Sequence, residues 1–117
     1  MKQKNHTECT GALLPIRDAL EVLSGKWKLQ IVIAISAGNS RFREIERAVV
    51  GISTKVLAKE LKDLEEHHLI KRAVHTGSPV VVEYSLDDYA ESLDQVIMSL
   101  NEWGKGHRKK MMQAEHS

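Results

Sequence analysis

The chain has 117 residues, and its 17 basic and 16 acidic side chains leave a formal net charge of +1. Hydrophobic residues make up 42% and charged residues 28% of the sequence, which is typical of one folded domain and excludes a disordered or collagen-like chain. The near-neutral balance lacks the overall basic excess of many nucleic-acid-binding domains, so any such surface has to be local.

The use of cysteine and of apolar residues indicates a cellular location. Cys9 is the one cysteine, which excludes an intramolecular disulfide and fits a reducing compartment. The N-terminal residues lack the apolar core of a secretory signal. The longest apolar run covers residues 31–35, whereas a membrane-spanning helix needs about 20 apolar residues. We therefore expect a cytoplasmic protein with no membrane partner.

Two helices are expected first. Pro15 suits the first turn of a helix, because its missing N–H would have no partner there anyway. Ile16 and Leu20 follow it on one helical face, and Gly25 suits the end of the helix. Residues 26–37 then form a short segment that is apolar on nearly all sides. A helix of this kind belongs in the centre of a domain.

Residues 42–68 are expected to hold two helices joined by a tight turn. The first should cover residues 42–49, and Gly51 marks the turn after it. Ser53 follows as a good N-cap, because its hydroxyl can accept a hydrogen bond from a free backbone N–H at the start of the next helix.

The helix expected over residues 53–68 has two unlike faces. Apolar residues and a histidine line one face, and lysines line the other: Leu57, Leu61, Leu64 and His68 against Lys55, Lys59 and Lys62. Between residues 53 and 62, three lysines stand against one glutamate, so this stretch is locally basic although the whole chain is not.

A β-hairpin is expected next. Residues 70–76 and 80–86 are rich in β-branched side chains and flank a turn of glycine, serine and proline. In the second strand, Val82 and Tyr84 alternate with Glu83 and Ser85. This alternation predicts one buried and one solvated face.

A final helix is expected over residues 88–104, with an apolar stripe of near-heptad spacing that Gly104 and Gly106 end. Such a stripe packs either on its own domain or on a second copy of the chain. We expect residues 1–117 to form a single domain with an arm (1–13), two helices and a turn (42–68), a hairpin (70–86), this helix (88–104) and a basic tail (105–117).

The order of these elements predicts an α+β fold that is mainly α: a winged helix-turn-helix with the two-stranded hairpin as its wing. In such folds the second helix of the motif buries one face and presents the other to the major groove of DNA, about 12 Å wide. A solvated lysine face explains the same pattern, so a protein–protein adaptor without DNA binding is the alternative function.

Several short sequences resemble those of HxlR-type winged helix-turn-helix transcriptional regulators, a bacterial, MarR-like group. They are Gly25-Lys26-Trp27-Lys28, Arg41-Phe42-Arg43-Glu44-Ile45, Gly51-Ile52-Ser53, Val82-Glu83-Tyr84-Ser85-Leu86 and Glu102-Trp103-Gly104. The resemblance covers most of the chain, about residues 9–104. It implies a homodimer that regulates transcription at a double-stranded DNA operator, with the N- and C-terminal helices forming the dimer.

Candidate DNA contacts lie in three places. Thr54 and Lys55 open the expected recognition helix and are the main candidates for base contacts, while Ser53 caps it. Lys59 and Lys62 are expected to meet phosphates. The other candidates are Arg41 and Arg43, which the resemblance places beside the DNA backbone, and Arg72, His75, Thr76 and Ser78 in the wing. For Arg43, an ion network with Glu46 and Arg47 is equally plausible.

The remaining candidates concern assembly and regulation. The resemblance assigns dimer contacts to Ile16, Leu20, Leu93, Ile97, Leu100 and Trp103. Cys9 is a candidate redox sensor, as in some members of the resembled family, with an inert thiol as the alternative. A small-molecule pocket near the dimer interface is another route to regulation. The sequence lacks metal-ligand spacing and known catalytic motifs, so we expect no cofactor, metal or enzymatic activity.

Overall fold

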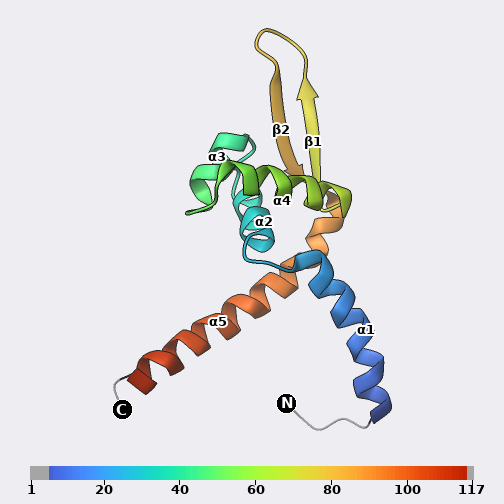
Figure 1. The fold of residues 1–117 in the computed structure, drawn as a ribbon, viewed down its shortest axis with the longest axis vertical. Coiled ribbons are helices and arrows are strands. Elements are labelled where there is room, and N and C mark those ends of the chain that lie inside the picture. The colour runs from blue at the N-terminus through green and yellow to red at the C-terminus, as the bar shows by residue number, and fades with distance from the viewer. Residues whose placement is uncertain (1–5, 116–117) are drawn as a thin grey trace.

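The computed structural model describes residues 6–115, with side chains from residue 11 onward. Its elements follow in the order α1 (His6–Leu23), α2 (Lys28–Ser36), α3 (Phe42–Ala48), α4 (Thr54–Glu66), β1 (Ile70–His75), β2 (Val81–Leu86), the 3-10 helix η1 (Asp88–Leu93) and α5 (Asp94–Glu115). In Figure 1, α2, α3 and α4 form one body. The hairpin projects from one side of this body, and α1 and α5 extend away on the other.

The core of the body is aliphatic. Its largest fully buried side chains come from α2, α3, α4 and the turn after α3: Ile31, Val32, Ile45, Val49, Leu57, Leu61 and Leu64. Burying one such side chain contributes about 1.5 to 3 kcal/mol. Trp27 and Phe42 pack against this cluster from its edge. The expectation of a central apolar helix is confirmed, except that Ile33 stays 46% exposed.

The first helix begins earlier than expected and contains Pro15 in its interior. A proline inside a helix removes one backbone hydrogen bond, which is why the sequence favoured a start at that point. The apolar stripe nevertheless crosses the proline without a break, because Leu13, Ile16 and Leu20 stand at i, i+3 and i+7. The expected arm of residues 1–13 is therefore helical from His6 onward.

The last helix also differs from the expectation. The 3-10 turn η1 precedes it, and α5 continues through Gly104 and Gly106 to Glu115. A glycine inside a helix costs only about 1 kcal/mol relative to alanine, and the lysine, arginine and methionine residues that follow are good helix formers. The segment expected as a basic tail is therefore helical as far as Glu115.

The recognition helix ends two residues before the expected limit. His67 caps α4, and His68 takes the left-handed conformation with φ of 62°. His68 is consequently exposed and does not share the buried face of Leu57, Leu61 and Leu64, as the spacing had suggested. Leu69, at 2% exposure, takes the buried place after the turn. Because a histidine occupies the left-handed position that glycine usually takes, no sequence signal marked this end.

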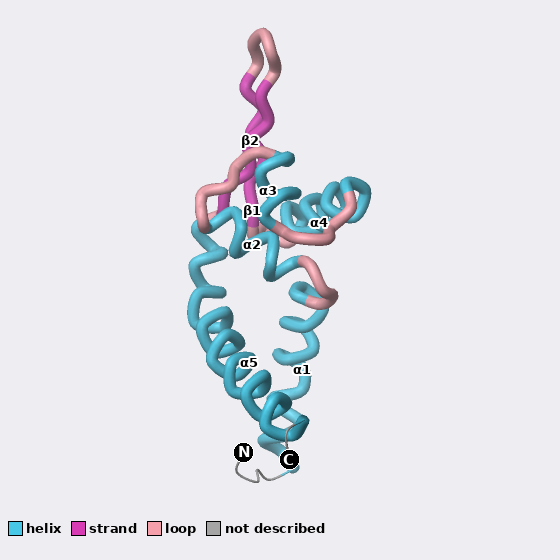
Figure 2. Tube along the Cα trace, turned by 90° about the vertical axis from the view of Figure 1, so that its left-hand side faces the viewer, coloured by secondary structure: helices cyan, strands magenta, loops and turns pink. Residues whose placement is uncertain are grey.

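The hairpin is antiparallel, and its register runs from Ile70 opposite Leu86 to His75 opposite Val81. Only its base is tied to the body: Ile70 is buried, and Tyr84 N donates to Ser40 O at 2.7 Å. Beyond the base, every residue of β1 is exposed and those of β2 are mostly half-buried. The expected alternation of a buried and a solvated face is therefore wrong: residues of both faces of β2 are half-buried, Tyr84 and Leu86 pack against the core, and the far end of the hairpin extends past the body (Figure 2).

Candidate nucleic-acid interface

The turn between α3 and α4 is built as the sequence predicted. Gly51 has a φ of 91°, a left-handed conformation that favours glycine. Ser53 caps α4, because its Oγ accepts a hydrogen bond from Val56 N at 3.2 Å. Ile52, between them, is buried and fixes the turn to the core. The start of α4 is therefore held in place by a cap and by an apolar anchor.

The two faces of α4 are confirmed for its leucines and lysines. Leu57, Leu61 and Leu64 are buried, while the three lysine residues are exposed: Lys55, Lys59 and Lys62. Within the described part of the chain, none of these lysines forms an ion pair. The lysine face, defined as Lys55, Lys59 and Lys62, is thus a set of free cations on a rigidly packed helix.

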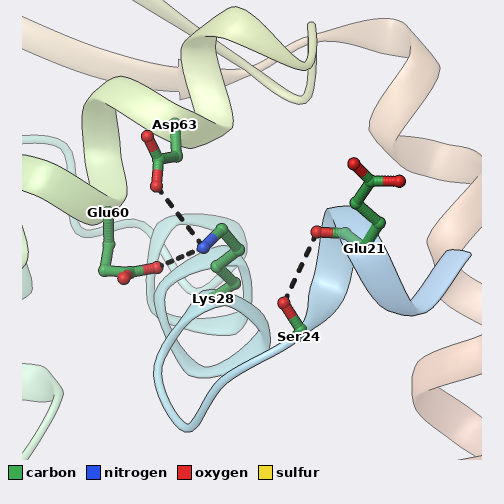
Figure 3. A network of polar contacts seen from close by, with 5 residues as sticks. All are labelled: Glu21, Ser24, Lys28, Glu60 and Asp63. Atoms are coloured by element: carbon green, nitrogen blue, oxygen red, sulfur yellow. Dashed lines mark hydrogen bonds and ion pairs between the residues drawn. The ribbon is translucent and has the colours of Figure 1, made fainter. Parts of the chain in front are cut away.

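A buried lysine of α2 pairs with two acidic residues of α4. Lys28 of α2 is 8% exposed, and its Nζ lies 2.7 Å from Glu60 Oε2 and 3.6 Å from Asp63 Oδ2. Figure 3 shows Lys28 reaching from α2 to the two carboxylates on α4. The burial of Lys28 assigns its side chain to the contact between α2 and α4. Glu60 and Asp63 are held toward α2 by the same contact.

A second network joins α3 to the start of α4. Glu46 Oε1 lies 2.9 Å from Arg43 Nη1, and its Oε2 accepts a hydrogen bond of 2.6 Å from the Thr54 hydroxyl. The Thr54 hydroxyl first, and then Arg43, lower the pKa of the Glu46 carboxyl below its usual value. Two candidate DNA contacts are therefore connected through one carboxylate. The sequence indicated the pairing of Arg43 with Glu46 but not the contact with Thr54, because α3 and the start of α4 meet only in the folded chain.

Arg41 stands at the N-cap of α3 with its side chain exposed. Glu44 closes this end of the helix: its Oε1 accepts hydrogen bonds from Arg41 N at 2.9 Å and from Ser40 N at 3.0 Å. These backbone donors, Arg41 before Ser40, lower the pKa of the Glu44 carboxyl. The segment that carries Arg41 is thereby fixed to both α3 and, through Ser40 O, the wing.

The candidate residues of the wing are all exposed. Arg72 and Lys62 line one shallow hollow between the hairpin and α4, together with Glu65. Nearer the tip, His75 Nε2 lies 3.7 Å from Glu83 Oε1. Thr76 and Ser78 stand in the loop between the strands, where the Ser78–Pro79 peptide is cis. The tip of the hairpin lies away from α4, as Figure 1 shows.

The residues expected at a dimer interface divide into two groups. Leu93 is buried in its own core and Ile97 packs against that core. Four others are at least half exposed: Ile16, Leu20, Leu100 and Trp103. Trp103 stacks on His107 with ring centroids 4.9 Å apart. The expected interface therefore keeps four apolar side chains that are at least half exposed in the part of the chain that the structure describes.

An open groove of about 710 Å³ lies between α2 and α5. Leu29, Ile33 and Ile97 supply apolar lining, and Asp94 and Asn101 supply polar groups. Cys9 lies on α1, but its side chain is outside the described residues. Among the described residues no group of three or more histidines, cysteines or acids is placed to hold a metal ion. None of the described helices is long and apolar enough to cross a membrane.

Comparison with known proteins identifies the family. A family model described as HxlR-like helix-turn-helix matches residues 22–112. YtcD of Bacillus subtilis, an uncharacterized HTH-type transcriptional regulator, is 35% identical over 94 residues, which are 80% of this chain and 75% of that protein. The crystal structure of YtcD matches with a TM-score of 0.76 over 80% of this chain and 96% of that one.

Two further solved structures are similar. The redox regulator HypR in its reduced form is 30% identical, with a TM-score of 0.77 over 85% of this chain and 98% of that one. A MarR-family transcriptional regulator from Porphyromonas gingivalis W83 is 34% identical, with a TM-score of 0.70 over 90% of this chain and 97% of that one. The resemblance drawn from the sequence, the winged helix-turn-helix fold and the assignment to regulators and not to enzymes are confirmed.

Proposed function

Because the chain belongs to the HxlR-like helix-turn-helix family of transcriptional regulators, we propose that it binds specific double-stranded DNA as a homodimer, with α4 of each subunit in the major groove. The lysine face carries this proposal, since it joins free cations to a helix that its buried leucines hold rigid. Thr54 and Lys55 contact base edges, and Lys59 and Lys62 contact phosphates. Two half-sites are then expected about 10 to 10.5 base pairs apart, or a multiple of that.

Retention on random duplexes, followed by selection of the tightest-bound sequences, tests the proposal. We expect binding that weakens steeply with salt, because lysine–phosphate contacts release counterions. Lys59→Ala should weaken binding to selected and random duplexes alike and reduce the salt slope by about 1 per subunit. Lys55→Ala should weaken the selected duplex more, by about 1 to 3 kcal/mol.

Lys109→Ala provides the matched control, because Lys109 is an exposed lysine on α5. The C-terminal part of this helix extends away from the hairpin and α4 (Figure 1). It should leave both affinities unchanged. If Lys55→Ala and Lys59→Ala also bind as the wild type does, the DNA face is elsewhere. If the wild type shows no salt-dependent retention, the adaptor function replaces the proposal.

The homodimer rests on the exposed apolar faces of the two terminal helices. Leu20 of α1 is 61% exposed and Trp103 of α5 is 69% exposed. Exposed apolar surface on this scale marks an interaction site. The radius of gyration is 17.7 Å, against about 13 Å for a compact chain of this length. In Figure 1 the two helices extend away from the body in different directions. A second copy that contributes the same two helices covers these faces.

Sedimentation at several protein concentrations tests this assembly. The wild type should sediment as a dimer at micromolar concentration. Trp103→Ala should weaken dimerisation at least tenfold, because buried aromatic side chains dominate interface energies, at roughly 2 kcal/mol each. A wild-type monomer at micromolar concentration contradicts the proposed dimer, even if DNA binding persists.

Redox control through Cys9 is a second candidate. One observation favours it: HypR, a redox regulator, matches 85% of the chain with a TM-score of 0.77. DNA binding should then change on oxidation in the wild type and not in Cys9→Ser. Equal responses of the two proteins to oxidant would exclude Cys9 as the sensor.

A further inference from the structure

Glu46 occupies an unusual position for an acid on a surface that is to meet DNA. Its side chain is 21% exposed and lies between Arg43, 69% exposed, and Thr54 at the first turn of α4. A carboxylate beside phosphates is repelled by them and weakens DNA binding, so its presence here calls for a structural reason. The hydrogen bonds to Arg43 and Thr54 indicate that reason.

We propose that Glu46 is a specificity-setting positioning residue: it fixes the Thr54 side chain for base contact and withholds Arg43 from phosphates. The proposal rests on the proposed DNA-binding function. It concerns the balance between sequence-dependent and sequence-independent binding, and not binding itself.

The geometry gives each oxygen of Glu46 one partner. Oε2 accepts the Thr54 hydroxyl at 2.6 Å, which directs that hydroxyl and orients the side chain. Oε1 takes Arg43 Nη1 at 2.9 Å, which occupies part of a guanidinium that could otherwise bind a phosphate in a bidentate manner. Because these partners lie on different helices, the carboxylate also joins α3 to the start of the recognition helix.

The charge of Glu46 persists at neutral pH. The Thr54 hydroxyl, then the Arg43 side chain, hold its pKa below the usual value of 4.5. Arg47 adds a weaker attraction on the same side. The carboxylate therefore keeps both partners under the conditions in which DNA is bound.

Glu46→Gln changes both effects together. Glutamine replaces one of the two accepting oxygens with an NH2 group, which can only donate, and its side chain carries no charge. With Arg43 released, we expect random duplexes to bind about threefold tighter per subunit, with a salt slope steeper by about 0.9 per subunit. With Thr54 less well held, the ratio of affinities for selected and random duplexes should fall about five- to tenfold.

Thr54→Val isolates the effect of Glu46 on base contact by residue 54. It removes the hydroxyl donor and leaves the Arg43–Glu46 pair in place, so the affinity ratio should fall while the affinity for random duplexes stays unchanged. In a Thr54→Val protein the hydroxyl that Glu46 holds is absent, so adding Glu46→Gln should lower the ratio of affinities for selected and random duplexes no further. A double-mutant cycle measures this.

Glu66→Gln is the matched control, because it removes one negative charge from the exposed C-terminal end of α4, from a residue without an ion pair in the described chain. It should leave the affinity ratio unchanged. The proposal is overturned if Glu46→Gln keeps the wild-type ratio and salt slope, or if Glu66→Gln shifts them equally. Absence of DNA binding by the wild type instead overturns the proposed function. Thermal unfolding of each variant verifies that it is folded.

Discussion

The body of the molecule, formed by α2, α3 and α4, buries its large apolar side chains, whereas the terminal helices α1 and α5 leave many of theirs exposed. In the body, Leu57 and Ile45 are fully buried by residues of the same chain. On α1 and α5, Leu20 and Trp103 are mostly exposed. The difference indicates that α2, α3 and α4 pack into a core within one chain, whereas the exposed faces of α1 and α5 would be covered in the proposed dimer. The lysine face is on α4 and therefore belongs to the body, whose core is formed within one chain.

The largest expected effect on the free energy of unfolding comes from replacing a leucine with alanine in the body, compared with the same replacement on α1. Leu57→Ala should lower the free energy of unfolding by about 3 kcal/mol or more, because it leaves a cavity in the core. Leu20→Ala should change stability only through the dimer, so its effect should grow with protein concentration. Urea unfolding at several concentrations measures both. Equal, concentration-independent losses would remove the distinction between the regions.

A smaller effect is expected at the contact between α2 and α4. Lys28→Met keeps the apolar stem of the side chain but leaves Glu60 and Asp63 without their cation in a mostly buried site. We expect a loss of about 2 to 3 kcal/mol in the free energy of unfolding. Adding Glu60→Gln to Lys28→Met should recover part of it, since the unpaired charge is then reduced. If Lys28→Met unfolds as the wild type does, the ion pair contributes nothing to the body.

The smallest expected effect is on the loss of stability at acidic pH. The folded chain lowers the pKa of Glu44 below 4.5 through backbone hydrogen bonds from Arg41 and Ser40. A carboxyl with a lowered folded pKa contributes stability above its unfolded pKa, and this contribution is lost as the pH falls through the folded value. Glu44→Gln should therefore show a shallower decline of the urea midpoint below about pH 4.5 than the wild type.

Glu66→Gln is the control for that measurement, because Glu66 is exposed at the end of α4. It should follow the wild-type decline. Part of the acid sensitivity should remain in Glu44→Gln, since the pKa of Glu46 is lowered as well. A Glu44→Gln profile that coincides with the wild type would show that the cap of α3 contributes no pH dependence.

Much of this organisation could be predicted from the sequence, because it depends on local spacing. The lysine and leucine faces of α4 follow from the helical period, and the cap at Ser53 and the turn at Gly51 follow from single-residue chemistry. Short motifs carried the family resemblance. The end of α4 at His68 and the continuation of α5 through two glycines were missed, because local propensities of about 1 kcal/mol do not decide a helix boundary.

The partners of the charged side chains were decided only by the tertiary structure. In the sequence, Lys28 lies 32 residues from Glu60, and Thr54 lies 8 residues from Glu46, so no spacing rule pairs them. Packing of α2 against α4 buries Lys28, and the approach of α3 to the start of α4 brings Glu46 to Thr54. The sequence by itself thus determined the order of the elements and the leucine and lysine faces of α4 through local periodicity. The fold decided which charges are neutralised and which stay free, because that depends on distances between elements.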